Sequence, residues 1–274
     1  DRPRPRAPLI PPRGPRPEFP WWLAILAVTG LWLFWQVLSD AVYAEVLDKL
    51  SAGIVVTAGV TLVAYGGACL MGLALALGVQ SRWLLPRQLS RLYIEVMRGV
   101  PIIVLLLYVA FVFVPALVWA WNGTLGEIGL GTLSTRDIPL LWRAVIALIL
   151  AYSAFLAEVF RAGLQAVDAG QIEAAKALGL SGWQRFRHVV FPQAFRTVLP
   201  ALGNDFVAMV KDSSLVSVLG VTDVTQLGKV IAAGNFRYFE TYNVVALIYL
   251  TMTITLSLAL RRFEAHLRRR ESPA

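Results

Sequence analysis

Six long apolar runs are the feature of this sequence that most restricts its fold. Each run approaches the roughly 20 residues that an α-helix needs to cross the hydrocarbon core of a bilayer. Within a membrane every backbone N–H and C=O group must be bonded internally, and a helix does this within its own segment. The sequence therefore predicts an all-α membrane protein with about six transmembrane helices, at residues 21–38, 53–79, 93–114, 140–160, 198–221 and 244–260.

The composition supports this class. Charged residues make up 15% of the 274 residues, whereas an ordinary soluble domain has about 25%. The mean hydropathy is +0.64. The formal net charge of +8 would suit a nucleic-acid-binding protein, but that function needs a basic face on a folded soluble domain. Here the Lys and Arg residues gather at the ends of apolar runs, so we expect membrane lipid around the chain and no nucleic acid.

The sequence lacks the residues that a disulfide, a metal site or ATP hydrolysis would require. Cys69 is the single cysteine of the sequence, which excludes an intramolecular disulfide. His188 and His266 stand apart without ligand-like neighbours, so no metal site is expected. The sequence also lacks the G-x-x-x-x-G-K-[ST] phosphate loop. We therefore expect no enzyme activity and no cofactor bound by this chain.

The distribution of basic residues predicts the orientation. Residues 1–20 are rich in Pro and Arg and are expected to form an extended or disordered tail. Lys and Arg concentrate in this tail and in residues 80–98, 161–196 and 261–270. Cytoplasmic loops carry such an excess, which predicts that both termini and the polar insert at 158–192 are cytoplasmic.

The polar insert has the signals of two short helices. Asp168 precedes a run of good helix formers, and Gly179 stands where a left-handed C-cap would fall. Ser181 and Gln184 have capping-box spacing and open a second helix, which Pro192 is expected to close. A loop that only connects two membrane helices is the alternative. A DNA-binding helix-turn-helix is disfavoured because membrane spans flank the insert.

A resemblance to a known family gives the insert a more specific interpretation. The cytoplasmic loop signature of bacterial ABC importer permeases, E-A-A-x-x-x-G followed by I-x-L-P, resembles this insert at Glu173, Ala174, Ala175, Gly179 and Pro192. The sequence departs from the signature in having Val and Phe where Ile and Leu are usual. Beyond this signature, the sequence resembles the histidine, glutamine and general L-amino-acid permeases of the polar amino-acid uptake branch. The matching stretches are residues 93–101, 157–163, 170–181, 191–196 and 211–221.

The resemblance covers roughly residues 51–267 and implies a fold and a set of partners. It implies a type I ABC importer-like core of five helices, to which residues 21–38 add an N-terminal helix. Residues 161–196 would be the coupling loop, and a small-residue surface at Ala174 and Ala175 would let an ATP-binding subunit approach closely. The implied partners are two copies of that ATPase with its ATP and Mg²⁺, a second or homologous permease and an extracytoplasmic amino-acid-binding protein. The implied location is the bacterial inner membrane.

Charged and hydroxyl residues at membrane depth are the second group of candidates. Lys211, Asp212, Ser213 and Ser214 interrupt the fifth apolar run, where a charge costs about 2.5–3.5 kcal/mol on insertion scales. Asp212 and the serines are good N-cap residues, so we expect a broken helix whose second half begins here and whose N-terminus faces the carboxylate of an amino acid. A structural Lys–Asp pair is an equally supported interpretation.

Two further pairs of charges have i,i+3 spacing near the cytoplasmic ends of predicted helices. They are Glu95 with Arg98, and Glu158 with Arg161, each a structural pair or a gating pair. An ion-coupled secondary transporter or channel using Lys211 and Asp212 is the alternative function. The sequence leaves open which amino acid is carried and whether the permease pair is homomeric or heteromeric.

Overall fold

The computed structural model describes residues 21–269, and this part of the chain is helical, with short connections and no strand. The predicted all-α fold is confirmed for these residues. The first half contains α1 (Trp21–Ser39), α2 (Ala41–Val79), α3 (Leu84–Gly99), α4 (Ile102–Tyr108), α5 (Val114–Trp121) and α6 (Leu140–Gln165). The second half contains α7 (Ala169–Ala177), α8 (Gly182–Arg185), α9 (Phe191–Asp212), α10 (Val224–Asn235) and α11 (Tyr238–Arg269).

Tighter and wider helical turns join several of these helices. Two π-helical segments, Val109–Phe113 and Asn122–Leu130, flank α5, and a third, Phe186–Val190, joins α8 to α9. Two 3-10 segments, Thr135–Asp137 and Ser213–Leu219, precede α6 and follow α9.

Four helical segments of the described chain are long and apolar enough to cross a membrane: Ala41–Val79, Ile102–Gly126, Leu140–Gln165 and Tyr238–Leu267. A fifth crossing results if the bent pair Gly182–Leu219 and Val224–Asn235 forms one broken span, with an angle of 51° between its parts. These five correspond to the expected core. The predicted first span is helical as α1, which is 19 residues long.

The third predicted span was misplaced. Residues 93–114 do not form one helix, because α3 ends at Gly99 and α4 begins at Ile102. Pro101 between them lacks a backbone N–H and restricts the residue before it to extended conformations. Val100 accordingly has φ −100° and ψ 129°. The membrane-length segment therefore starts after Pro101, and α3 is a separate, more polar helix.

The centre of the molecule is the long contact between α2 and α6, which is more extensive than that of any other pair of helices. Two glycines of α2 make this approach possible. A Cβ added to Gly72 would lie 3.0 Å from the Ser153 carbonyl oxygen, and one added to Gly67 would lie 2.7 Å from the Ile149 side chain. By contrast, a Cβ at Gly59 or Gly66 would meet nothing within 4 Å. Gly67 and Gly72 therefore serve the packing of α2 against α6, whereas Gly59 and Gly66 do not.

A buried arginine braces the opposite end of α6. Arg143 is only 7% exposed. Its guanidinium donates to three backbone carbonyls, those of Ile138 (2.8 Å), Ala110 (2.8 Å) and Thr135. The carbonyl of Ala110 belongs to a π-helical segment, where the α-helical bonding pattern is broken. Arg143 therefore ties the connection before α6 to the break between α4 and α5.

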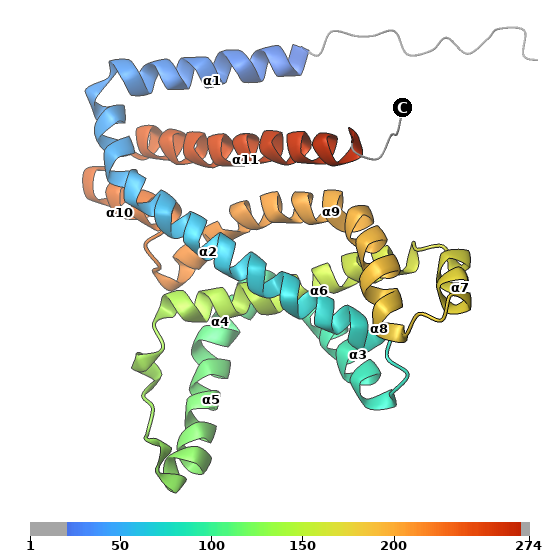
Figure 1. Cartoon of the computed structure of the whole chain (residues 1–274). Coiled ribbons are helices and arrows are strands. Elements are labelled where there is room, and N and C mark those ends of the chain that lie inside the picture. The colour runs from blue at the N-terminus through green and yellow to red at the C-terminus, as the bar shows by residue number, and fades with distance from the viewer. Residues whose placement is uncertain (1–20, 270–274) are drawn as a thin grey trace, which may run out of the picture.

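The arrangement in Figure 1 places three regions on one side of the molecule. The first residues of α1, the end of α11 and the short helix α7 all lie on the right of this view. The junction of α1 with α2, and α10, lie on the left. Helices α1 and α11 thus begin and end, respectively, on the side that carries α7.

Candidate functional site

The short helix α7 begins where the sequence predicts. Asp168 is its N-cap, and the carboxylate Oδ1 accepts hydrogen bonds from the backbone N–H groups of Gly170 at 2.8 Å and Gln171 at 3.3 Å. An aspartate in this position satisfies donors that have no partner within the helix. The helix start is therefore fixed by local sequence and needs no tertiary contact.

The C-terminus of α7 is equally well defined by local sequence. Gly179 has φ +75°, in the left-handed region. Its N–H donates to the Lys176 carbonyl at 2.9 Å, and the Leu180 N–H donates to the Ala175 carbonyl at 3.1 Å. This pair of bonds is the Schellman motif, for which glycine is the preferred residue. The predicted C-cap is confirmed.

The second short helix, α8, opens with the predicted capping box. Gln184 Oε1 accepts from the Ser181 N–H at 2.9 Å, and Ser181 Oγ accepts from the Gln184 N–H at 3.4 Å. Together these bonds satisfy two backbone donors at the start of the helix. Only the tight turn around Gly179 separates α7 from α8.

Pro192 does not close this helix, contrary to the prediction. The chain continues from α8 through the π-helical segment Phe186–Val190 into α9, where Pro192 is in the first turn. The N–H of Phe191 donates to the Phe186 carbonyl, five residues earlier. Proline is tolerated here because the start of a helix does not require its N–H. The insert is therefore rigidly continuous with α9.

The exposed face of α7 differs in part from the predicted one. Glu173 and Ala174 are exposed, but Ala175 is only 3% exposed. Ala175 faces the chain itself because α7 packs against the segment Phe186–Val190, so it does not offer a surface to another protein. Leu178 and Trp183, which the sequence analysis missed, are 80% and 66% exposed. Large apolar side chains in a polar insert were a signal that could have identified them.

Figure 1 shows α7 at the margin of the molecule, beyond the ends of α6 and α9. Its contacts are mainly with α8 and the π-helical segment before α9. A short helix that is capped at both ends and attached to two long helices can carry a displacement from one face of the protein into the membrane-spanning part.

The polar group at membrane depth is organised differently from the prediction. Asp212 is not an N-cap, because the chain continues as a 3-10 helix and its side chain accepts no capping bond. Its Oδ2 instead accepts a hydrogen bond from the Tyr152 hydroxyl of α6 at 2.6 Å. Ser213 is buried, and its Oγ donates to the Val210 carbonyl at 2.7 Å. The proposed half-helix N-terminus at Asp212 is therefore wrong.

The second half of the broken span begins at Asp223. Its Oδ1 accepts from the Gln226 N–H at 2.8 Å, so Asp223 is the N-cap of α10. Its Oδ2 accepts from the Tyr249 hydroxyl of α11 at 3.1 Å. The spacing of Asp223 and Gln226 is an N-terminal helix signal that sequence reasoning could have used. Gly220, with φ +76°, makes the turn that separates this helix from the 3-10 segment.

The other predicted pathway residues surround the Tyr152–Asp212 contact. Lys211 is exposed and Ser214 is half-buried, and neither forms a hydrogen bond or ion pair with a described side chain. Asp205 lies two helical turns before Asp212 on α9, and the ring of its neighbour Phe206 lies 4.9 Å from that of Tyr65 on α2. Sequence reasoning missed this second carboxylate. The site thus combines two acidic side chains with two tyrosines from α2 and α6.

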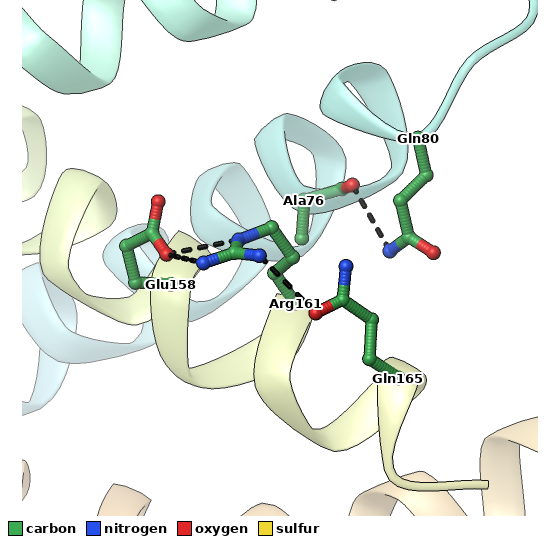
Figure 2. A network of polar contacts seen from close by, with 5 residues as sticks. All are labelled: Ala76, Gln80, Glu158, Arg161 and Gln165. Carbon is green, nitrogen blue, oxygen red and sulfur yellow. Dashed lines mark hydrogen bonds and ion pairs between the residues drawn. The ribbon is translucent and has the colours of Figure 1, made fainter.

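The two predicted charge pairs differ from each other. Arg161 donates to Glu158 Oε2 from Nη2 at 2.5 Å and from Nε at 2.9 Å, which confirms the pair. Figure 2 also shows its Nη1 donating to Gln165 Oε1, at 3.1 Å. Glu95 and Arg98 are both exposed and do not bond to each other in the described structure. The predicted ion pair on α3 is therefore not formed among the described residues.

Comparison with known proteins assigns the chain to a family. The family model of the binding-protein-dependent transport system inner membrane component matches residues 68–273. The chain is 38% identical over 199 residues to the probable amino-acid permease protein YxeN of Bacillus subtilis, which covers 72% of this chain and 81% of that protein. It is 33% identical over 222 residues to the glutamine transport system permease protein GlnP of Escherichia coli, covering 81% and 94%.

A solved structure supports the same assignment. The chain is similar to one in a crystal structure of an amino acid ABC transporter with histidines, with a TM-score of 0.67 and 38% identity over 81% of this chain and 96% of that one. The MetNI methionine ABC transporter in an inward-facing conformation shares the fold, with a TM-score of 0.59 and 20% identity. The chain therefore belongs to the binding-protein-dependent transport system inner membrane components, and it is a membrane-spanning permease subunit of an ABC importer.

Proposed function

We propose that this chain is the permease of an ATP-driven, binding-protein-dependent importer of amino acids. The relatives at 33–38% identity are named as amino-acid or glutamine permeases, and the similar solved structure is of an amino acid transporter. The family assignment favours this function over an ion-coupled secondary transporter or channel. ATP and Mg²⁺ would bind to a separate ATPase, and this chain would hold no cofactor.

The observation that carries the proposal is the geometry of α7. It is a nine-residue helix, capped at both ends, that lies at the margin of the molecule with Glu173, Ala174 and Leu178 exposed. This is the shape expected of a coupling helix that docks in a groove of an ATP-binding subunit. Gly179 makes the tight turn that follows, and Pro192 begins the long helix on the other side.

The connections of α7 suggest how ATP binding would reach the membrane. Tyr152 lies 13 residues before the end of α6 at Gln165, which is about 20 Å of helix. Asp212 is at the far end of α9, which begins directly after the coupling insert. The hydrogen bond between Tyr152 and Asp212 thus joins the two helices that α7 links. When paired ATPases close and displace α7, rocking of α6 against α9 would change the space around this contact.

The substrate pathway would run beside that contact. Asp205 and Asp212 offer acceptors to the ammonium group of an amino acid, and the Tyr65 and Tyr152 hydroxyls can exchange bonds with it. Lys211, Ser213 and Ser214 adjoin this site as further pathway candidates. A charged side chain inside a membrane is costly unless it faces water or a partner, so carboxylates at this depth fit a route for a polar solute.

The proposed assembly has two permease subunits, identical or homologous, with two ATPases on the α7 side and an extracytoplasmic amino-acid-binding protein opposite. Basic residues near the ends of α1 and α11, and the common side of α1, α7 and α11 in Figure 1, support cytoplasmic termini. We assign residues 51–267 to the transport core and residues 161–196 to the coupling loop. Residues 21–38 would be an accessory N-terminal span. The expected tail at residues 1–20 lies outside the described residues.

A charge reversal tests the docking role of α7. Glu173→Lys alters an exposed side chain that forms no hydrogen bond or ion pair with a described side chain, so the permease should still fold. We expect less of the ATPase to co-purify with a tagged permease, and uptake into proteoliposomes to fall by about tenfold or more. Asp48→Lys makes the same charge reversal on an exposed residue in the first part of α2, away from α7. This variant should leave co-purification of the ATPase unchanged.

The outcomes separate the parts of the proposal. Equal ATPase recovery with Glu173→Lys and Asp48→Lys would contradict the docking role of α7. Wild-type proteoliposomes that accumulate labelled amino acid without ATP would instead contradict the ATP-driven function and favour ion coupling.

A further inference from the structure

A polar pocket lies near the α7 end of the molecule, apart from the Tyr152–Asp212 contact. Its volume is about 380 Å³, within the range of small-molecule sites. Its polar lining comes from α3 (Arg91, Glu95), the end of α2 (Gln80) and the end of α6 (Glu158, Arg161, Gln165). Along α6, Glu158 is six residues beyond Tyr152, or about 9 Å.

Tertiary contacts hold the three walls of this pocket in place. The Tyr93 hydroxyl of α3 donates to the Leu150 carbonyl of α6 at 2.8 Å and lies 2.9 Å from Ser153 Oγ. The packing of α3 against α2 is also close, because a Cβ added to Gly78 would lie 2.2 Å from Ser90 Oγ. The pocket walls are thus parts of a packed structure and not loose surface side chains.

The donors of the pocket converge. Figure 2 shows the side-chain nitrogens of Gln80 and Gln165 facing each other from α2 and α6. Gln165 turns its oxygen to Arg161 Nη1, and its own NH₂ group has no acceptor among the described residues. Gln80 Nε2 makes only a long bond of 3.4 Å to the Ala76 carbonyl. Two amide donors beside a guanidinium are suited to binding a carboxylate.

The acceptors of the pocket are also incompletely used. Glu158 receives both of its bonds from Arg161 on Oε2, and Oε1 has no partner in the described part of the chain. On α3, Arg91 and Glu95 are exposed and form no hydrogen bond or ion pair with a described side chain. Two arginines and two glutamates give the lining no net charge. An anion or a cation alone would leave half of these groups unmatched, whereas a zwitterion would match both.

We propose that this pocket binds a free α-amino acid by its zwitterionic backbone. The carboxylate lies among Arg91, Arg161 and the amides of Gln80 and Gln165, and the ammonium group lies between Glu95 and Glu158. Recognition of the backbone makes the site tolerant of different side chains. The choice of an amino acid as ligand rests on the proposed function, because an imported amino acid would leave the permease on this side. The balanced charges of the pocket are a separate argument for a zwitterionic ligand.

The test measures binding to the purified permease–ATPase complex without its binding protein. Equilibrium dialysis with radiolabelled L-glutamine should detect a site from which unlabelled L-alanine displaces the label. N-acetyl-L-alanine lacks the ammonium group, L-alanine methyl ester lacks the carboxylate, and inorganic phosphate is only an anion, so none of them should displace it. Arg91→Gln and Glu95→Gln should each weaken binding by about tenfold, equivalent to about 1.4 kcal/mol.

Two control variants define the site. Arg82→Gln removes an exposed charge just before α3 that does not line the pocket, and it should bind as the wild type does. Tyr152→Phe alters the membrane-depth contact, so any label that this variant releases was bound at that contact and not in this pocket. The proposal is overturned if no label binds, if Arg91→Gln behaves like Arg82→Gln, if only Tyr152→Phe abolishes binding, or if the N-acetyl compound or phosphate displaces the label. Uptake into proteoliposomes tests the proposed function separately, since this binding assay does not depend on transport.

Discussion

Gly179 offers the most discriminating test of the proposal that α7 is a coupling helix. Its φ of +75° is in the left-handed region, which costs an L-residue with a side chain roughly 1–2 kcal/mol. A Cβ added there would meet nothing within 4 Å, so Gly179→Ala introduces no clash. Alanine also lowers the conformational entropy of the unfolded chain, which stabilises the folded state by about 0.4–1 kcal/mol. The expected net cost is about 1 kcal/mol, borne by the C-terminus of α7 alone.

A change of this size should be measurable in docking. Nine residues are too few for a stable isolated helix. The C-cap therefore contributes much of the stability of the helical conformation in which α7 would dock. A cost of about 1 kcal/mol corresponds to about a fivefold loss in affinity. We expect that loss between the detergent-solubilised permease and the ATPase subunit, measured by titration, with a parallel decrease in uptake by proteoliposomes. Thermal unfolding of the membrane helices should not change.

Two matched variants decide whether the reasoning is right. Gly182→Ala is three residues away, has no positive φ, and would place its Cβ in ordinary contact at 3.8 Å from Arg185 Nη2. It should be neutral. Gly179→Asn should bind more tightly than Gly179→Ala, because asparagine tolerates the left-handed conformation. Equal affinities for Gly179→Ala and Gly182→Ala would refute the conformational argument.

Three further predictions concern the membrane-spanning part. Tyr152→Phe removes the 2.6 Å bond to Asp212 and should cut substrate-stimulated ATP hydrolysis several-fold, while persistence of full stimulation would exclude this contact from the pathway. Asp223→Ala removes a fully buried N-cap and should lower stability by about 2 kcal/mol in detergent unfolding, with Asp223→Asn less harmful. Gly72→Val forces a side chain against the backbone of α6 and should cost about 1–3 kcal/mol, whereas Gly66→Val, which meets nothing, should be tolerated in the same assay.

Local sequence signals predicted the helices of the polar insert at residues 158–192 well. Asp168, Gly179 and the Ser181–Gln184 pair act within a few residues of themselves, so their caps could be identified without knowledge of the fold. Pro192 was misjudged because proline ends one helix or begins another with the same ring geometry. Which of these occurs depends on the π-helical turn before it, and that turn has no clear sequence signature.

The polar residues at membrane depth were harder to interpret from the sequence. Asp212, Ser213 and Ser214 are good N-cap types, but the helix restarts at Asp223 after Gly220 has turned the chain. Their partners come from distant parts of the sequence: Tyr152 for Asp212, and Tyr249 for Asp223. Such partners are set by how helices pack, and a pattern read along one segment does not contain them.

The sequence alone determined that this protein is an all-α membrane protein with a polar, twice-capped insert between two long helices. It could do so because hydrophobic length and helix caps are properties of short segments. Tertiary structure decided that Ala175 faces inward, that Arg143 is buried against carbonyls, and that Arg91 and Glu95 meet Glu158 and Arg161 around one pocket. These outcomes depend on how α2, α3 and α6 pack together, because a side chain's neighbours across helices are set by the rotation and crossing of those helices.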